Sequence, residues 1–450
     1  MIKHKLKKGY DIKLAGKTEK SIVELDKPGF VAMQPVEFRG IKPKLTVDLG
    51  SEVKIGSELF YDKQSPKVKF VSPASGKVVK INRGERRIVQ EIVIESESDE
   101  YVDFGKMSFD EITKSGREKI IESLLNGGLW PYILQRPYSK IANPAQSPRD
   151  IFINSANTAP LAPKSELLID GNEKYLEAGI AALSKLTEGK IYLSVNGNAE
   201  KFSRLNNVEI HYFEGPHPAG NTSVHIHHIK PINLGEIVWY MYITHVALIG
   251  KFFLEGLFPV ERIIAVAGSS VNENARKYYK TRLGVPVQNL VNEGQLTDED
   301  VRYISGNILN GKRVLEKGYL GFYDHLLTVI PESKKRELFG WLKPGLKEES
   351  FSRSFLSKIF PQKEYIKDTR IHGGKRAFIQ TGEYEKVLPM DILPSYLVKS
   401  IIAEDIEEMI GLGLLEVDEE DFALCSYICP SKINFGEYIR SGLDLLEREG

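Results

Sequence analysis

The chain has 450 residues, more than one hydrophobic core usually organises, so two to four domains are predicted. Hydrophobic residues make up 42% and charged residues 27%, which is the composition of a folded globular protein rather than a disordered one. Lys plus Arg and Asp plus Glu are 61 each. This zero net charge lacks the basic excess of nucleic-acid-binding proteins, and we exclude nucleic acid as a partner.

Three further features predict a cytoplasmic protein with no membrane span. The basic segment 1–17 lacks the apolar core of a secretory signal. The most apolar stretch, 237–260, is interrupted by a histidine, a lysine and a glutamate, so we do not expect it to cross a bilayer. Two cysteines, Cys425 and Cys429, are too few for a disulfide framework, as is usual in a reducing compartment.

Residues 45–95 alternate apolar and polar positions over short runs that glycines interrupt, a pattern typical of a small β sandwich or barrel. We assign residues 1–105 to this unit, with an N-terminal extension. The Asp62-Lys63 pair resembles the hairpin tip of the biotinyl/lipoyl-carrier fold, in which the lysine carries a swinging arm. One hypothesis is therefore a stand-alone carrier modified at Lys63. The other is a solvated lysine, because Gln64-Ser65-Pro66 follows where such domains keep a plain hairpin.

Residues 106–260 alternate strands with helices, which indicates a parallel α/β sheet. The capping sequence Ser108-Phe109-Asp110-Glu111 begins a predicted helix that stops at Gly127-Gly128. The segment 157–163 contains two prolines where a dinucleotide-binding turn has Gly-x-Gly-x-x-Gly, so we expect a nucleotide-like sheet without its site. The strands are predicted at 151–156, 190–197 and 208–215, and a helix at 174–187.

The rest of the chain predicts two more units. A strand at 261–271 begins a small mixed unit, assigned to residues 261–345. Residues 346–450 are predicted to be helical, because 391–415 and 435–449 repeat apolar residues at helical spacing. Cys425 and Cys429 lie in this last unit. An iron–sulfur cluster or a structural zinc needs four ligands, so we interpret both as buried packing residues.

Six of the nine histidines fall between positions 211 and 245, so a metal site has to be considered. His225 and His227 would share one face of a predicted strand, and His217 could approach from a neighbouring turn. A catalytic zinc usually takes three such ligands. No His-Glu-x-x-His pattern is present, and histidines that bond backbone groups or line an interface are the other interpretation. A histidine-based metallohydrolase stays an alternative, which metal analysis would test.

Short motifs spread in order along the chain point to one family. They are Ser72–Val78 with Ile81–Gly84, Gly128–Trp130 with Arg136–Lys140, Leu186–Lys190, Gly215–Gly220, Arg353–Leu356, and Asp418–Asp421 leading into Ala423–Cys425. Together they resemble the A subunits of the sodium-translocating NADH:quinone oxidoreductases. That family is similar in turn to the NADH-binding flavoprotein subunit of respiratory complex I.

The resemblance implies a multi-domain fold of α/β plus all-β units. These are a biotinyl/lipoyl-like β sandwich, a Rossmann-like parallel α/β domain without its flavin loop, a small β-grasp (SLBB-like) domain and a C-terminal helical domain with a degenerate iron–sulfur region. It also implies a subunit that holds no cofactor, in a six-subunit complex that oxidises NADH, reduces quinone and pumps Na+. FAD, FMN, riboflavin and iron–sulfur centres would then belong to partner subunits.

Within that complex the resemblance implies a place on the cytoplasmic face of the bacterial inner membrane, beside the membrane-embedded quinone/flavin subunit. Two segments, Glu37–Gly40 and Trp130–Lys140, combine aromatic and cationic side chains, which a quinone ring with two carbonyl acceptors would use. Protein interfaces prefer the same residue types, so docking of domains or partners is the alternative. We assign no catalytic or metal-binding residue. The candidate quinone-proximal or partner-contact residues are Phe38, Arg39, Gly40, Trp130, Arg136, Pro137, Tyr138, Lys140 and His217.

Overall fold

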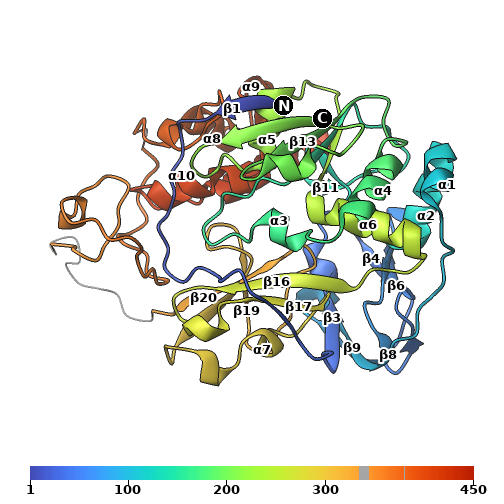
Figure 1. Ribbon diagram of the computed structural model, residues 1–450. Coiled ribbons are helices and arrows are strands. Elements are labelled where there is room, and N and C mark those ends of the chain that lie inside the picture. The colour runs from blue at the N-terminus through green and yellow to red at the C-terminus, as the bar shows by residue number, and fades with distance from the viewer. Residues whose placement is uncertain (334–343, 380, 450) are drawn as a thin grey trace.

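In the computed structural model, residues 1–333, 344–379 and 381–449 are described. They form four sheets and a C-terminal group of helices (Figure 1). The multi-domain fold predicted from the sequence is therefore confirmed: an antiparallel barrel-sandwich, a mostly parallel α/β sheet, a small mixed sheet and helices. Among the described residues, no helix is both long enough and apolar enough to span a bilayer.

The barrel-sandwich consists of two antiparallel sheets, and the buried Phe60 and Phe70, which pair within one of them, stack their rings at 4.4 Å. Lys63 is exposed at the two-residue tip between β6 and β7, where the sequence predicted it. Asp62 is buried beside it and accepts hydrogen bonds from the backbone N–H groups of Lys42 and Gln64. The strands are β3 (Phe30–Met33), β9 (Val89–Ser98), β8 (Ser75–Arg83) and β5 (Glu52–Val53) in one sheet, and β4 (Pro43–Leu45), β6 (Glu58–Asp62) and β7 (Ser65–Val71) in the other.

The α/β domain is built on a seven-stranded sheet in the order β1-β14-β13-β12-β15-β10-β11, with its first five strands parallel. Ile151 and Ile153 point to the core beneath α4 and α6, whereas Phe152 between them packs toward α5 on the opposite face. The strands are β1 (Ile2–Lys5), β14 (Glu209–Glu214), β13 (Ile191–Val195), β12 (Ile151–Asn154), β15 (Val238–Tyr242), β10 (Leu134–Arg136) and β11 (Lys140–Ile141). The helices of this domain are α1 (Phe109–Lys114), α2 (Arg117–Asn126), α3 (Ser165–Leu168), α4 (Glu173–Leu183), α5 (Thr222–Ile229) and α6 (Ile243–Glu255).

The close contact between α4 and α6 depends on glycine. A Cβ added to Gly250 would lie 1.8 Å from the Tyr175 carbonyl oxygen, and one added to Gly179 would lie 2.1 Å from that of Val246. The two helices therefore touch backbone to backbone over the sheet. This fixes the position of α6, whose first residues lead directly into the candidate site.

Two sequence predictions in this domain need correction. The helix expected from Ser108 onward has its capping box with Glu111, but it is interrupted at Ser115 and continues as α2 only after Gly116. The segment around His225 and His227 is helix α5 and not a strand. A connection between the parallel strands β14 and β15 needs a crossover, for which a helix is the usual solution.

The mixed sheet has the order β19-β18-β20-β16-β17-β2, with β16 and β20 parallel at its centre. Its outer strand β2 comes from the N-terminal extension, as β1 does in the α/β sheet. Of the range 261–345 assigned to this unit, residues 334–343 lie outside the described residues. The strands are β16 (Glu261–Ala267), β17 (Tyr278–Arg282), β18 (Val301–Ser305), β19 (Lys312–Val314), β20 (Leu326–Pro331) and β2 (Ile22–Glu24), with the short helix α7 (Val287–Leu290).

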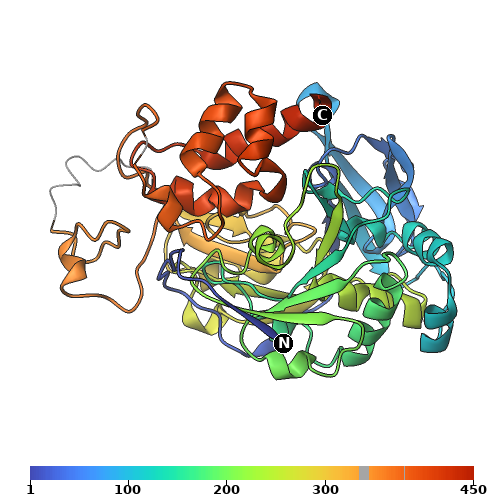
Figure 2. The ribbon, with the colours of Figure 1, turned by 90° about the horizontal axis from the view of Figure 1, so that it is seen from above.

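The C-terminal helices have a core of their own, next to the α/β domain (Figure 2). The predicted helix 435–449 is α11 (Phe435–Glu449), whereas the predicted 391–415 is divided where Glu404 adopts φ 56°. Cys425 and Cys429 are fully buried in this core, and the Cys429 sulfur lies 3.1 Å from the Tyr384 hydroxyl. Their predicted burial is confirmed. The other helices are α8 (Pro394–Ile402), α9 (Ile406–Gly411) and α10 (Ala423–Ile428).

Candidate functional site

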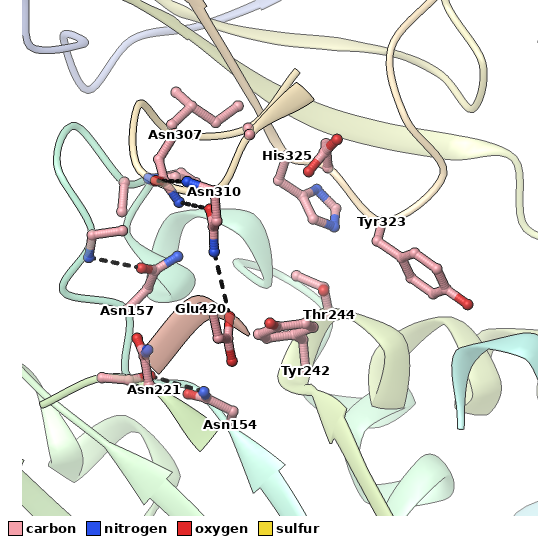
Figure 3. Close-up of a pocket in the computed structure, with 18 of the residues that line it drawn as sticks. Asn154, Asn157, Asn221, Tyr242, Thr244, Asn307, Asn310, Tyr323, His325 and Glu420 are labelled. Carbon is pink, nitrogen blue, oxygen red and sulfur yellow. Dashed lines mark hydrogen bonds between the residues drawn. The ribbon is translucent and has the colours of Figure 1, made fainter. Parts of the chain in front are cut away.

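A cavity of about 370 Å³ lies where the strand order of the α/β sheet reverses, at the carboxyl ends of β12 and β15. Open α/β sheets usually bind their ligands at this place. The mixed sheet forms the opposite wall, and Glu420 reaches in from the C-terminal helices. Figure 3 shows this arrangement, with Asn307, Asn310 and His325 facing Asn154 and Tyr242 across the cavity.

Three carboxyl groups line the cavity, and burial raises the pKa of each. The pKa of Glu37 rises to about 7 through burial and the nearby Asp324. The pKa of Asp324 is itself raised by burial, and that of Glu420 rises to about 8 through burial and its acidic neighbours. Burial lowers the pKa of His325 to about 4, so its imidazole is neutral at pH 7. The cavity is therefore polar, and the arginine and the lysine that line it lie beside carboxyl groups.

The loop after β12 uses its polar groups within the chain. The Asn154 side chain donates to the Gly220 carbonyl at 2.9 Å and accepts from the Ala156 N–H at 2.8 Å. The Thr158 hydroxyl accepts from the Gly220 N–H at 2.9 Å, and a Cβ on Gly220 would lie 2.6 Å from the Thr158 nitrogen. The loop and the Gly215–Gly220 turn thus close on each other. This geometry does not fit a phosphate cradle, which needs free N–H groups.

His217 lines the same cavity and is 4% exposed. Its Nδ1 lies 3.1 Å from the Thr158 hydroxyl, and its backbone N–H donates to Asp11 at 2.9 Å. Burial lowers the pKa of His217 to about 4. The residue therefore joins the N-terminal extension, the loop after β12 and the cavity wall as a neutral imidazole.

Next to the cavity, arginines from three parts of the fold converge on the acidic run 418–420. Arg136, on β10, is fully buried, lies 2.9 Å from the Asp418 carboxylate and stacks over the Tyr240 ring at 4.8 Å. Arg39, from the barrel, and Arg440, on α11, lie 3.3 and 2.8 Å from the same carboxylate. These cations lower the pKa of Asp418 well below its usual range. We call this group the arginine–acid cluster; it joins the C-terminal helices to the other domains.

The structure places most of the predicted contact residues around that cluster. Trp130 is fully buried, and its indole N–H donates to the Ala142 carbonyl at 2.7 Å. Phe38 is buried against Phe322, whereas Gly40 has open space around it. Tyr138 follows Pro137 in the left-handed region, φ 79°, and its carbonyl accepts from Arg440 at 3.1 Å. Lys140 pairs with Glu447 and lies 5.4 Å from the Tyr138 ring centroid. Of the set, Tyr138, Lys140, Arg39 and Gly40 reach solvent in part or fully.

The clustered histidines contact the chain itself. His225 donates to the Ala219 carbonyl at 3.0 Å, His227 lies 2.7 Å from the Glu416 carboxylate, and His228 donates to the Pro389 carbonyl at 2.8 Å. His4 on β1 lies 2.9 Å from His211 on β14. Helix geometry points His225 and His227 to different sides of α5, and within the described ranges no group of three potential ligands could hold a metal ion.

Comparisons with known proteins identify the family. Three family profiles match: the NqrA N-terminal barrel-sandwich hybrid domain over residues 4–97, the NqrA second alpha/beta domain over 115–258 and the NQRA C-terminal domain over 263–316. The A subunit of the Na+-translocating NADH-quinone reductase from Yersinia pseudotuberculosis is 38% identical over 99% of this chain and 100% of its own. The chain belongs to the NqrA family, the A subunits of these reductases.

Other members of the NqrA family agree. The Photorhabdus laumondii protein is 39% identical over 99% of this chain and 100% of its own, and the Vibrio alginolyticus protein 37% over 99% of each. Among solved structures, an NAD+-reducing [NiFe]-hydrogenase chain aligns with a TM-score of 0.37 and 11% identity over 78% of this chain and 67% of that one, too low to carry an argument.

The sequence motifs of the NqrA family included the acidic run 418–421, but sequence reasoning did not join it to Arg39 or Arg136. Arg39 and Asp418 are 379 positions apart, and no local pattern connects them. Glu37 lies in a predicted contact segment, but the sequence does not predict that it and Asp324 are buried carboxyls of one cavity. In the sequence each is an isolated acidic residue next to an aromatic residue. This pattern is too common to identify a buried pair.

Proposed function

We propose that this chain is the cofactor-free cytoplasmic subunit of a membrane complex that oxidises NADH, reduces quinone and pumps Na+ out of the cell. The observation that carries the proposal is the match at 37–39% identity, over almost the whole chain, to proteins named as the A subunits of that reductase. In this role the chain serves as a scaffold. NADH oxidation, flavins and iron–sulfur centres are assigned to its partners.

The geometry at the strand switch point supports a chain without flavin. The loop after β12 carries prolines at positions 160 and 163, and its side chains already occupy the neighbouring N–H groups. Glu37 and Asp324 add buried carboxyls where a phosphate would need cations. The cations that line the cavity stand beside acids: Arg39 pairs with Asp418, and Lys312 acts on Glu37 and Asp324.

The two thiols in the C-terminal helices support the proposal that this chain holds no iron–sulfur centre. Cys425 and Cys429 are buried, and burial raises the pKa of the Cys425 thiol, which opposes the thiolate form that a cluster requires. We propose that the purified chain has no absorption band between roughly 400 and 500 nm, where bound flavin or iron–sulfur centres would absorb. A band that follows the protein through purification at a constant ratio would contradict the proposal.

We place the quinone end of electron transfer near the segment from Trp130 to Lys140, beside the membrane-embedded quinone/flavin subunit. Because Trp130 and Arg136 are buried, the groups that a quinone or a partner could reach are Tyr138 and Lys140. An aromatic ring beside a cation suits a flat ring with two carbonyl acceptors. The same pair suits a protein interface, so the experiment has to separate the two roles.

The variant Tyr138→Asn removes the ring at a position whose φ of 79° asparagine tolerates better than most residues. We expect a higher apparent KM for quinone in the assembled complex, with NADH oxidation by an artificial acceptor unchanged. Tyr396→Asn, at an exposed tyrosine on α8, serves as the control. Weak assembly with normal quinone kinetics would assign the segment to a partner interface. Normal assembly and normal kinetics would leave it with neither role.

A further inference from the structure

Residues 351–379 form a segment that projects from the body on the side opposite the barrel-sandwich (Figures 1 and 2). We call it the projecting segment. It has under a tenth of the residues, yet it holds six of the 21 exposed large apolar side chains in the described chain. These six are Leu356, Ile359, Phe360, Ile366, Ile371 and Ile379, with exposed fractions between 43% and 69%.

The projecting segment is attached to the body at defined points. Tyr365 is buried and exchanges backbone hydrogen bonds with the N-terminal extension at Lys13 and Ala15, of 2.7 and 2.9 Å. The Phe351 ring packs edge-on against Tyr10 at 5.4 Å. The Thr369 hydroxyl donates to Glu332 at 2.8 Å. Four of the six exposed apolar residues, from Leu356 to Ile366, therefore lie between attachment points, and the chain holds them away from its own core.

The same segment is strongly basic in a chain of zero net charge. Residues 351–379 contain seven Lys or Arg and two acidic residues, Glu364 and Asp368. Both acids are paired, at 3.2 Å from Lys17 and 2.7 Å from Arg370. In contrast, five exposed cations have no carboxylate within ion-pair distance in the described part of the chain. They are Arg353, Lys358, Lys363, Lys375 and Arg376.

An anionic bilayer surface binds segments in which exposed apolar side chains alternate with cations. The lipid headgroups attract the cations, and the apolar side chains enter the boundary between headgroups and acyl chains. A protein partner fits less well, because lysine is depleted at protein interfaces and four of the seven cations here are lysines. We propose that the projecting segment docks on the anionic phospholipid surface of the membrane, with Ile359 and Phe360 at its deepest point.

This inference rests on the proposed function only in identifying the membrane as the one that holds the complex. It is tested on the purified full-length chain, alone, with two kinds of vesicle. One contains phosphatidylglycerol and phosphatidylethanolamine at about 30:70, and the other is pure phosphatidylcholine. We expect co-sedimentation with the anionic vesicles at least ten times stronger than with the neutral ones, and a loss of binding in 0.5 M salt.

The decisive variant is Ile359→Ser with Phe360→Ser, because these side chains are 66% and 65% exposed and their replacement leaves the core intact. We expect a drop of at least tenfold in anionic-vesicle binding with an unchanged melting curve. Leu234→Ser with Leu315→Ser, at sites 70% and 72% exposed elsewhere, is the matched control and should bind as the parent does. A second variant, Lys358→Glu with Lys363→Glu, should lose binding in the same way.

Three results would overturn the inference: no binding of the parent to anionic vesicles, an equal loss in the Leu234/Leu315 control, or full binding by the Ile359/Phe360 variant. If the parent chain does not bind vesicles and the Ile359/Phe360 variant no longer co-purifies with membrane proteins, the projecting segment docks on a protein instead. Failure of the proposed function has a different readout, since the tagged parent chain would then bring down no reductase, whatever its affinity for vesicles.

Discussion

Replacing Arg136 by Met tests whether the arginine–acid cluster holds the C-terminal helices in place. Methionine keeps a similar volume and removes the charge, so the effect comes from the ion pair rather than from a cavity. Arg136 is fully buried and contacts Asp418 from another domain at 2.9 Å. Loss of one partner of a buried pair costs roughly 3–5 kcal/mol. Because Arg39 and Arg440 still contact Asp418, we expect about 3 kcal/mol, the lower end of that range.

The assay is amide hydrogen exchange of α11 under native conditions, which reports the free energy of local opening. About 3 kcal/mol corresponds to exchange faster by a factor on the order of one hundred. Lys54→Met is the control, because the Lys54–Glu100 pair has side chains 57% and 61% exposed and such pairs contribute about 0–1 kcal/mol.

The double variant Arg136→Met with Asp418→Asn completes the test. If the two side chains interact directly, its cost is smaller than the sum of the single costs by about 0.5–3 kcal/mol. Unchanged exchange of α11 in Arg136→Met, or strict additivity in the double variant, would refute the idea that this contact attaches the C-terminal helices.

Other buried side chains give three more predictions. Glu420 has a pKa of about 8 in the folded chain and about 4.3 when unfolded. Its neutral form is therefore favoured by folding, and stability falls as pH rises between these values. Glu420→Gln should flatten that fall in melting curves from pH 5 to 8, and an unchanged slope would contradict this. Replacing Cys425 and Cys429 by Ala should lower the free energy of unfolding in urea by about 1–3 kcal/mol and leave electron transfer of the complex intact. Lost turnover at unchanged stability would argue for a redox role. His217→Gln replaces an imidazole that is neutral at pH 7 by another neutral hydrogen-bonding side chain. It should therefore lower the free energy of unfolding by less than about 1 kcal/mol between pH 6 and 8. A larger loss of stability near pH 6 alone would mean that the imidazole is charged.

Sequence patterns predicted those parts of the fold in which local periodicity and burial agree. Helix 435–449 is found at the predicted residues because its apolar stripe alone determines which face is buried. The hairpin tip at Lys63 lies where the resemblance to the biotinyl/lipoyl-carrier fold predicted it, between two strands that alternate apolar and polar residues. Where two periods fit the same residues, the prediction was wrong. The segment around His225 alternates like a strand, but the sheet topology requires a crossover helix there.

The candidate site was less predictable, because its groups come from distant parts of the chain. The sequence placed Arg136 and Trp130 in a turn with aromatic neighbours, which is equally compatible with a surface and with a buried joint between domains. The acidic run of the C-terminal helices meets the buried Arg136. Trp130 is instead buried in the main core, edge-on against Trp239. Likewise, Glu37 and Asp324 share the cavity only because the barrel-sandwich and the mixed sheet meet there.

The most direct test of the proposed function is co-purification of the tagged chain from its own membranes. Mild detergent extracts of cells that produce the tagged protein would be passed over an affinity column and assayed for Na+-stimulated NADH:quinone reductase activity. We predict that the activity and a set of membrane-embedded subunits elute with the chain, while flavin and iron absorbance belong to the complex and are absent from the chain purified alone. Elution of the chain without membrane subunits and without reductase activity would contradict the proposed function.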